Sequence, residues 1–317
     1  MRSLRDIRLD FARVTTTMLD QLCKLLSTRF LNLTLETCSY PVDYIIQQTA
    51  LKVNQLEWGN EESPRATIKL LAAFIEKSSS TITSLTLLTN VDGLLDFGRL
   101  PRLTSFILLQ EPADCKSLRE FLIANPQLVY LELRRPVQDL SLLPSSALPN
   151  LTRIRVPAYL IHDIVIGRPV VSVRFHSLFR SRIMLGGVRS LSQSTTPIIE
   201  LTMGLGHCAS PLSMILDAVV EVMPHLERVQ LSCHESVRSI LYYDAVQPRL
   251  TTHFQDAQEV LDHLVRLGSL REIRLLLSSC KLTRKGEVER HFKERFNHPI
   301  FLEVSPLLPR TIKCTCD

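Results

Sequence analysis

The sequence has few aromatic residues and no long apolar run. Only 6% of its 317 residues are aromatic, although 45% are hydrophobic, so a folded core must be mainly aliphatic. No stretch approaches the roughly 18 consecutive apolar residues of a membrane helix. The opening segment, MRSLRDIRLD, lacks the apolar region of a secretory signal, and the eight cysteines lack the spacing of a disulfide framework. These absences predict a cytoplasmic or nuclear protein with reduced thiols.

Charge of one sign is not concentrated anywhere along the chain. The formal net charge is +5, which is too small to indicate nucleic-acid binding without a basic cluster. Where basic residues gather, between residues 284 and 295, Glu287, Glu289 and Glu294 are interleaved with them. This pattern is typical of the solvated face of a helix. Neither a nucleic acid nor a membrane is therefore expected as a partner.

What the sequence does contain is a block that recurs along its length. An apolar residue is followed by two other residues, a second apolar residue, one other residue and a third apolar residue (LxxLxL). The intervals between successive third positions run from 19 to 29 residues, except for a last one of 44, close to the roughly 20–29 residues of leucine-rich repeats. These third positions are Leu9, Leu35, Trp58, Leu87, Leu108, Leu133, Val156, Phe175, Met203, Leu231 and Leu275, with a weak last copy at Leu302 and Val304.

Turn residues and helical patterns share the phase of these blocks. Pro101, Pro126, Pro149 and Pro224 each stand two positions before the first apolar residue of a block. Proline has no N–H and a fixed φ, so it stops a helix and suits the lead-in to a strand. Amphipathic patterns predict helices between the blocks, at residues 15–27, 64–77, 115–124, 211–223 and 255–267.

The repeating unit is therefore strand, turn, helix, turn, and one such unit cannot cover its own apolar faces. Stacked units predict an α/β fold, a leucine-rich-repeat solenoid of horseshoe shape with a parallel sheet on its concave face and helices outside. We expect one domain over residues 1–317, with about 11–12 irregular repeats. The 44-residue interval predicts an extra helix or loop insertion at residues 236–246.

Several blocks carry a more specific pattern, in which Cys or Asn follows the strand. They are LTLETC (33–38), LTLLTN (85–90) and LLLSSCKL (275–282), and the phrases NPQLVYLEL, LPNLTRIRV and MPHLERVQL accompany them. In these segments the chain resembles the leucine-rich-repeat region of F-box proteins of the divergent fungal type.

This resemblance implies the substrate-binding part of an F-box-type ubiquitin ligase receptor, with a protein substrate as its partner. In such proteins an N-terminal F-box docks a Skp-type adaptor of a cullin ligase. No F-box is found here, because the chain opens within the strand block at Leu4. The adaptor is thus expected only if an F-box is encoded upstream. The alternative is a leucine-rich-repeat scaffold or regulator unrelated to ubiquitin.

In a solenoid of this kind, the three apolar residues of each block point inward to the core, and the residues that alternate with them face the concave surface. The earlier blocks present mostly neutral residues there (Asn32, Thr34, Ser84, Thr86, Ser105), whereas the later blocks present five arginines and one histidine against one glutamate, with Glu200 as an interruption. We expect this surface to bind an acidic or phosphorylated protein segment through bidentate arginine contacts. The candidate partner-binding residues are Tyr130, Glu132, Arg134, Arg153, Arg155, Arg174, His176 and Arg228.

Two weaker patterns point to a cofactor or a metal. Gly204 and Gly206 follow a strand block and precede a helix, as in a dinucleotide-binding fingerprint, but Pro211 would fall in the first turns of that helix. A tight turn explains the two glycines equally well. Cysteine and histidine residues could form a zinc set, although core or repeat-loop positions account for them too. We therefore predict no catalytic, cofactor or metal site and no enzyme. The possible zinc set is His207, Cys208, Cys233 and His234. The terminal pair Cys314 and Cys316 has no further Cys pair or His nearby in the sequence, which favours two free thiols.

Overall fold

The computed structural model places most of the first two thirds of the chain and part of the last third. The residues it describes are 4–10, 12–41, 43–59, 64–88, 98–110, 115–134, 140, 143–175, 181–205, 212–233, 263–264, 266–278 and 300–305.

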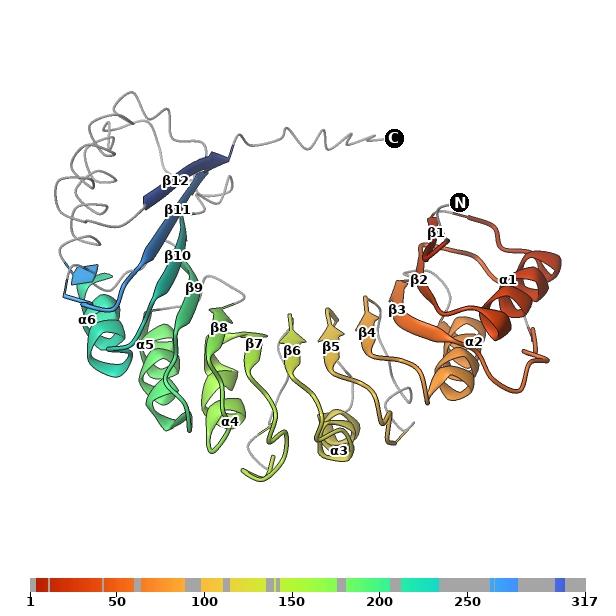
Figure 1. Cartoon of the computed structure of the whole chain (residues 1–317), viewed down its shortest axis with the longest axis horizontal. Helices are drawn as coiled ribbons and strands as arrows, with labels where there is room; N and C mark the ends of the chain where they lie inside the picture. The colour runs from red at the N-terminus through yellow and green to blue at the C-terminus, as the bar shows by residue number, and fades with distance from the viewer. Residues whose placement is uncertain are drawn as a thin grey trace, which may run out of the picture. The chain divides into compact units, whose positions relative to one another are not determined.

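In the described ranges, twelve β-strands form one open, parallel sheet, and their order in the sheet is their order in the chain (Figure 1). Each strand overlaps one of the LxxLxL blocks, and several extend one to three residues beyond it, so the predicted strand positions are confirmed. The strands are β1 (Asp6–Asp10), β2 (Leu31–Glu36), β3 (Val53–Gly59), β4 (Ser84–Leu87), β5 (Ser105–Leu108), β6 (Tyr130–Leu133), β7 (Arg153–Val156), β8 (Ser172–Phe175), β9 (Glu200–Leu205), β10 (Arg228–Cys233), β11 (Glu272–Ser278) and β12 (Ile300–Ser305).

Helices lie between many of these strands. Four match predicted helices within one or two residues, whereas α4 and α5 were not predicted, and the predicted helix at 255–267 lies largely outside the described residues, as does the insertion at 236–246. None of the helices in the described ranges has both the length and the apolar character needed to cross a membrane. The helices are α1 (Thr16–Thr28), α2 (Pro64–Ser78), α3 (Cys115–Ala124), α4 (Ile161–Val165), α5 (Ser181–Ser190) and α6 (Leu212–Val222), with 3-10 segments η2 (Ala158–Leu160) and η3 (Leu191–Gln193).

The chain forms two compact units. The first unit holds residues 1–172 with 193–196, and the second holds residues 173–192 with 197–317. The first unit contains β1–β7 with α1–α4, and the second contains β9–β12 with α5 and α6. The single domain over residues 1–317 stays a prediction.

In the first unit, helices α1, α2 and α3 lie on the same side of the strands (Figure 1). Alternate strand residues face these helices and form the core. In β2, for example, Leu31, Leu33 and Leu35 are buried, whereas the residues between them are half-buried. Alternation in a strand places successive side chains on opposite faces, so the other face of β1–β7 is free of these helices.

Aromatic residues are few but occupy the core of this unit. Trp58, predicted as a core residue, is fully buried in β3. Its ring stacks on that of Tyr40 with centroids 5.1 Å apart, and the ring of Phe74 from α2 lies 6.0 Å away. Phe106 of β5 and Phe121 of α3 form a similar pair at 4.8 Å. Each pair ties a strand to the segment that packs on it.

The inward direction predicted for the first apolar residue of each block is wrong in the first two blocks. Leu4 is 49% exposed and Phe30 is 59% exposed, although Val53 and Leu103 at the equivalent position are buried. Both exposed residues precede their strands, and the Phe30 ring instead contacts the ammonium group of Lys52 at 5.7 Å. At β1, the edge of the sheet, only one strand is a neighbour, so burial there is incomplete.

Hydroxyl groups tie several repeats to the main chain of the repeat before them. Thr81 donates to the carbonyls of Leu51 and Val53, at 3.2 and 2.9 Å. Ser194 and Ser269 make the same bridge to two carbonyls that are two residues apart in the preceding repeat. Most of these carbonyls lie just before a strand, and the Arg168 carbonyl also accepts a hydrogen bond from the Thr195 N–H at 3.0 Å. The partners of the two serines are Arg168 and Val170 for Ser194, and Pro224 and Leu226 for Ser269.

Arg168 is a fully buried charged residue of the first unit. Its guanidinium donates to five carbonyl oxygens, three of them at the end of α4 and two in the segment that precedes β7. Burial lowers its pKa to about 10, so the group is still charged at neutral pH. The negative end of the helix dipole favours this charge. The acceptors are Pro144 (2.7 Å), Ala147 (2.7 Å), Asp163 (3.1 Å), Ile164 (2.8 Å) and Ile166 (3.3 Å).

We predict that Arg168→Met lowers the free energy of unfolding by about 3–5 kcal/mol, because several buried carbonyls lose their donor at once. Urea unfolding followed by circular dichroism measures this change. Arg102→Met, at an exposed arginine in the turn before β5, is the matched control and should shift stability by less than about 0.5 kcal/mol. Equal effects of the two substitutions would contradict a supporting role for Arg168.

Candidate functional site

The face of β1–β7 that points away from α1–α3 is here called the open face. Its side chains are set by strand register. Ser105, Tyr130 and Arg153 lie opposite one another on β5, β6 and β7. In the next row along these strands, Glu132 lies opposite Arg155. Five of the eight candidate residues therefore come together on β6, β7 and the residue that follows β6: Tyr130, Glu132, Arg134, Arg153 and Arg155.

Glu132 lies at the centre of this group. The Tyr130 hydroxyl donates to its Oε2 at 2.7 Å. Arg155 Nη1 lies 3.2 Å from Oε1 and 3.4 Å from Oε2, and Arg134 Nε lies 3.5 Å from Oε1. A buried carboxylate is tolerated only when it is paired and hydrogen-bonded, and this one has both kinds of partner.

The structure corrects one expectation about this residue. Glu132 alternates with apolar positions, as predicted, yet it is only 3% exposed rather than open to solvent. The reason is the length of its neighbours. Tyr130, Arg134 and Arg155 all direct their polar ends toward the shorter carboxylate, and so they cover it.

Arg153 differs from the other arginines of the group. It is exposed, and its guanidinium lies 5.8 Å from the centre of the Tyr130 ring, a cation–π contact. Across the described ranges no carboxylate lies within ion-pair distance of it. Its N–H groups are therefore available to an external anion, in the planar fork that binds carboxylate or phosphate in two places.

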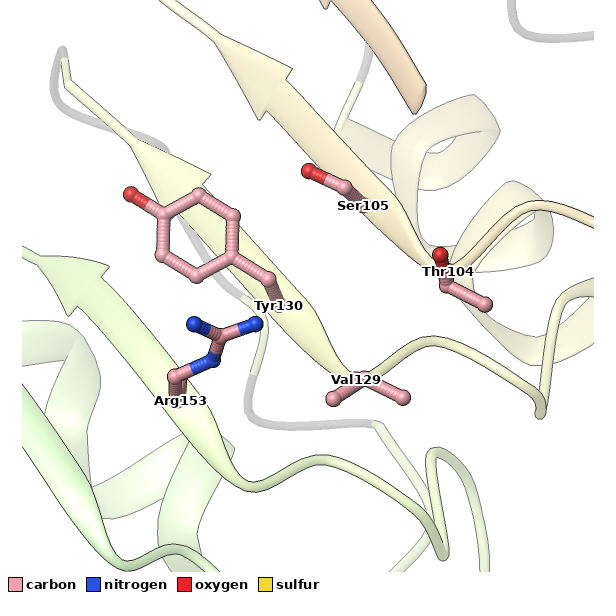
Figure 2. Close-up of a pocket in the computed structure, with 5 residues that line it drawn as sticks. All are labelled: Thr104, Ser105, Val129, Tyr130 and Arg153. Atoms are coloured by element: carbon pink, nitrogen blue, oxygen red, sulfur yellow. The ribbon is translucent and has the colours of Figure 1, made fainter. Parts of the chain in front are cut away.

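A cavity of about 370 Å³ opens beside Arg153. Figure 2 shows the Arg153 guanidinium next to the Tyr130 ring. The Ser105 hydroxyl lies on β5, the strand on the other side of Tyr130. The Thr104 hydroxyl donates to the Thr83 carbonyl at 3.2 Å, whereas the side chain of Ser105 has no hydrogen-bond partner among the described residues. The cavity thus combines one unpaired cation, a free hydroxyl and an aromatic wall. Its lining residues are Thr104, Ser105, Val129, Tyr130 and Arg153.

The remaining candidates belong to the second unit or cannot be placed. Arg174 lies on β8 and is exposed. Arg228 lies on β10 opposite Glu200 of β9 in the strand register, and the two side chains form an ion pair. Glu200 was predicted to interrupt the basic row, and in the structure it neutralises one of its members. His176 lies outside the described residues.

Sequence reasoning missed the charges at the other end of the open face. The early strands were predicted to present mostly neutral residues, but β1–β3 also place four carboxylates and one arginine there. Arg8 pairs with Glu36 at 3.2 Å and with Asp10 at 3.7 Å. The alternation used for the later strands would have found this acidic end if it had been applied to every block. Its residues are Asp6, Arg8, Asp10, Glu36 and Glu57.

Two carboxylates of this end, Asp6 and Glu57, have no basic partner among the described residues, and Asp6 accepts a hydrogen bond from the Asn32 amide at 2.7 Å. Of the two, Glu57 lies nearer to the basic strands. It is half-buried, and its side chain accepts a hydrogen bond from the Thr34 hydroxyl at 3.5 Å. Burial raises its pKa, and the nearby Glu36 carboxylate adds to this effect, although Arg8 and Thr34 oppose it. Thr34 lies directly opposite Glu57 on the adjacent strand β2.

The described part of the chain contains no group of three or more His, Cys, Asp or Glu residues that could hold a metal ion. Gly204 lies within β9, and α6 begins at Leu212. The other residues of the two weaker patterns cannot be judged: Gly206, His207, Cys208, Pro211, His234, Cys314 and Cys316 lie outside the described residues, and the side chain of Cys233 is not described.

Comparison with models of known protein families gives no match, and no curated protein matches the chain either. A relationship to F-box proteins therefore stays a prediction from the repeat segments of the sequence.

We predict that Glu132→Gln lowers the free energy of unfolding by about 1–3 kcal/mol, since Arg155 and Arg134 lose the charge that holds them. Chemical unfolding measures the change. Glu120→Gln is the control, because Glu120 pairs with Lys116 on the exposed surface of α3 at 3.8 Å. Surface pairs contribute about 0–1 kcal/mol, so the control should differ little from the unmodified chain. A Glu132 variant as stable as this control would mean that the group does not support the fold.

Proposed function

We propose that this chain is a leucine-rich-repeat solenoid that recognises a protein partner and leaves any chemistry to an associated enzyme. What supports the solenoid is the regular succession of parallel strands, one for each repeat, and the hydroxyl bridges between neighbouring repeats. Recognition is supported by the open face, which has a cavity beside an exposed arginine and is not covered by helices α1–α3.

The single observation that carries this proposal is the unpaired guanidinium of Arg153 at the cavity between β5 and β7. Arg134 and Arg155 are held by Glu132, so Arg153 is the member of the group that an anionic ligand meets first. A carboxylate or phosphate group of a protein segment fits this chemistry. Three arginines against one glutamate leave the cluster with a net charge of +2, which would also speed the encounter with an acidic partner.

For the biological role, we propose the substrate-binding part of an F-box-type ubiquitin ligase receptor in the cytoplasm or nucleus. The support is the resemblance of the repeat segments to those of F-box proteins. A Skp-type adaptor would join only if an F-box is encoded upstream of Met1. A scaffold or regulatory role without ubiquitin predicts the same open face but no adaptor.

We predict that Arg153→Glu removes most protein partners that the chain captures from cell extract, because the reversed charge repels an anionic segment at the cavity. Affinity capture followed by quantitative mass spectrometry measures the loss. The control is Arg119→Glu, at an arginine of α3 on the other side of the sheet. Partner recovery that is unchanged by Arg153→Glu, or equally reduced by the control, contradicts the proposed site.

The same experiment, with the chain expressed together with any upstream coding sequence, tests the ligase role. Recovery of a Skp-type adaptor and a cullin in the eluate is the expected result. Specific partners retained through Arg153 without adaptor or cullin would instead favour the scaffold.

A further inference from the structure

The open face of the first unit changes sign from one end to the other. Strands β1–β3 present four carboxylates and one arginine. Strands β6 and β7, together with Arg134 just after β6, present three arginines and one glutamate. The strands between them contribute uncharged side chains to this face. These intermediate residues are Ser84, Thr86, Ser105 and Ile107.

Within each end, at least one charge is left without an ionic partner. At the acidic end, Arg8 pairs with Asp10 and Glu36, so Asp6 and Glu57 have none. Asp6, on the edge strand, accepts a hydrogen bond from Asn32 at 2.7 Å, whereas Glu57, on β3 and nearer to the basic strands, has only the weak hydrogen bond from Thr34. At the basic end, Glu132 holds Arg155 and Arg134, so Arg153 has only the ring of Tyr130. These statements cover the described ranges, and both residues belong to the first unit.

The separation of the two charges matches a short extended peptide. Glu57 is on β3 and Arg153 is on β7, four strands further along the sheet. Strands are spaced by about 4.8 Å, so the two charges lie roughly 19 Å apart across the strands. The register places Glu57 in the row of Arg155, two residues along the strand from Arg153, so the line between the two charges is oblique and about 20 Å long. An extended chain covers that distance in about six residues. The hydroxyl groups of Ser84 and Thr86 on β4 and of Ser105 on β5 lie between them. They can donate hydrogen bonds to the main chain of a segment that crosses the strands, or accept hydrogen bonds from it.

We propose that the open face of the first unit binds a bipolar protein segment, which lies across the strands with a lysine or arginine at Glu57 and a carboxylate or phosphate at Arg153. This inference rests on the proposed function and adds to it the composition and spacing of the bound segment. Each ligand charge meets a side chain that lacks a counter-charge, and Glu57 is the one of the two such carboxylates that lies nearer to the basic strands. A segment with an acidic group alone would satisfy only one end.

Synthetic fluorescent peptides test this proposal with the full chain. The first peptide carries an arginine and a phosphoserine separated by about five uncharged residues, to match the spacing of the sites. The second has the same composition but places the two charged residues side by side. A third replaces the arginine with citrulline, which removes the charge, and a fourth replaces phosphoserine with glutamate. Fluorescence anisotropy gives the dissociation constant of each.

We predict that the spaced peptide binds about ten-fold more tightly than the adjacent and citrulline peptides. Glu57→Gln should weaken the spaced peptide by a similar factor and leave the citrulline peptide unchanged, and Glu120→Gln on α3 is the matched control variant. Comparison of the phosphoserine and glutamate peptides shows which anion the cavity prefers. The peptide comparison uses the unmodified chain, so it stands even if a variant fails to fold.

The two proposals fail in different ways. In one outcome, Arg153→Gln abolishes peptide binding, but the citrulline replacement, the Glu57→Gln variant and the spacing of the charges leave the dissociation constant unchanged. The anion site then stands, and the bipolar segment is overturned. If Arg153→Gln has no effect either, or the spaced peptide does not bind, both the bipolar segment and the anion site of the proposed function are overturned.

Discussion

Each repeat of this chain depends on its neighbour, because a single strand and its helix cannot bury their own apolar residues or pair their own turn carbonyls. The carbonyls of Leu51 and Val53 illustrate the polar half of this constraint, since their partner, the Thr81 hydroxyl, comes from the next repeat. Asn125 has the same role after α3, where it binds main-chain groups of Gly98 and Leu100. Each repeat is therefore stabilised by the repeat next to it, and the register of each strand is fixed by the preceding strand.

The apolar packing within and between repeats involves only one face of the strands. The residues that face α1–α3 must be apolar and close-packed, whereas the alternate residues on the open face are free to carry charge. Because the register is fixed, the sequence determines where each side chain lies on the open face. Glu57 and Arg153 lie at set positions because their strands are locked by buried neighbours such as Trp58 and Ile154. A recognition surface on this fold can thus change its chemistry without any change in its core.

The alternation of side chains explains what the sequence could predict. The strands follow directly from LxxLxL spacing, and so does the placing of Tyr130, Glu132, Arg153 and Arg155 on one face. The burial of Glu132 could not be predicted, because it depends on which way three longer side chains turn. Helix α4 is only five residues long and gives almost no periodic signal. Its support by Arg168 depends on contacts between segments distant in sequence.

A glutamate within a basic cluster makes that cluster more selective. Without Glu132, three arginines of similar reach would form a diffuse positive surface that attracts any polyanion. Glu132 instead binds Arg155 and Arg134 and fixes them, at the cost of part of the net charge. The guanidinium that remains, Arg153, is held by the Tyr130 ring, and the Tyr130 hydroxyl is itself held by Glu132. One buried carboxylate thus directs an anionic ligand to a single pre-positioned group, which favours recognition of a defined segment over general attraction.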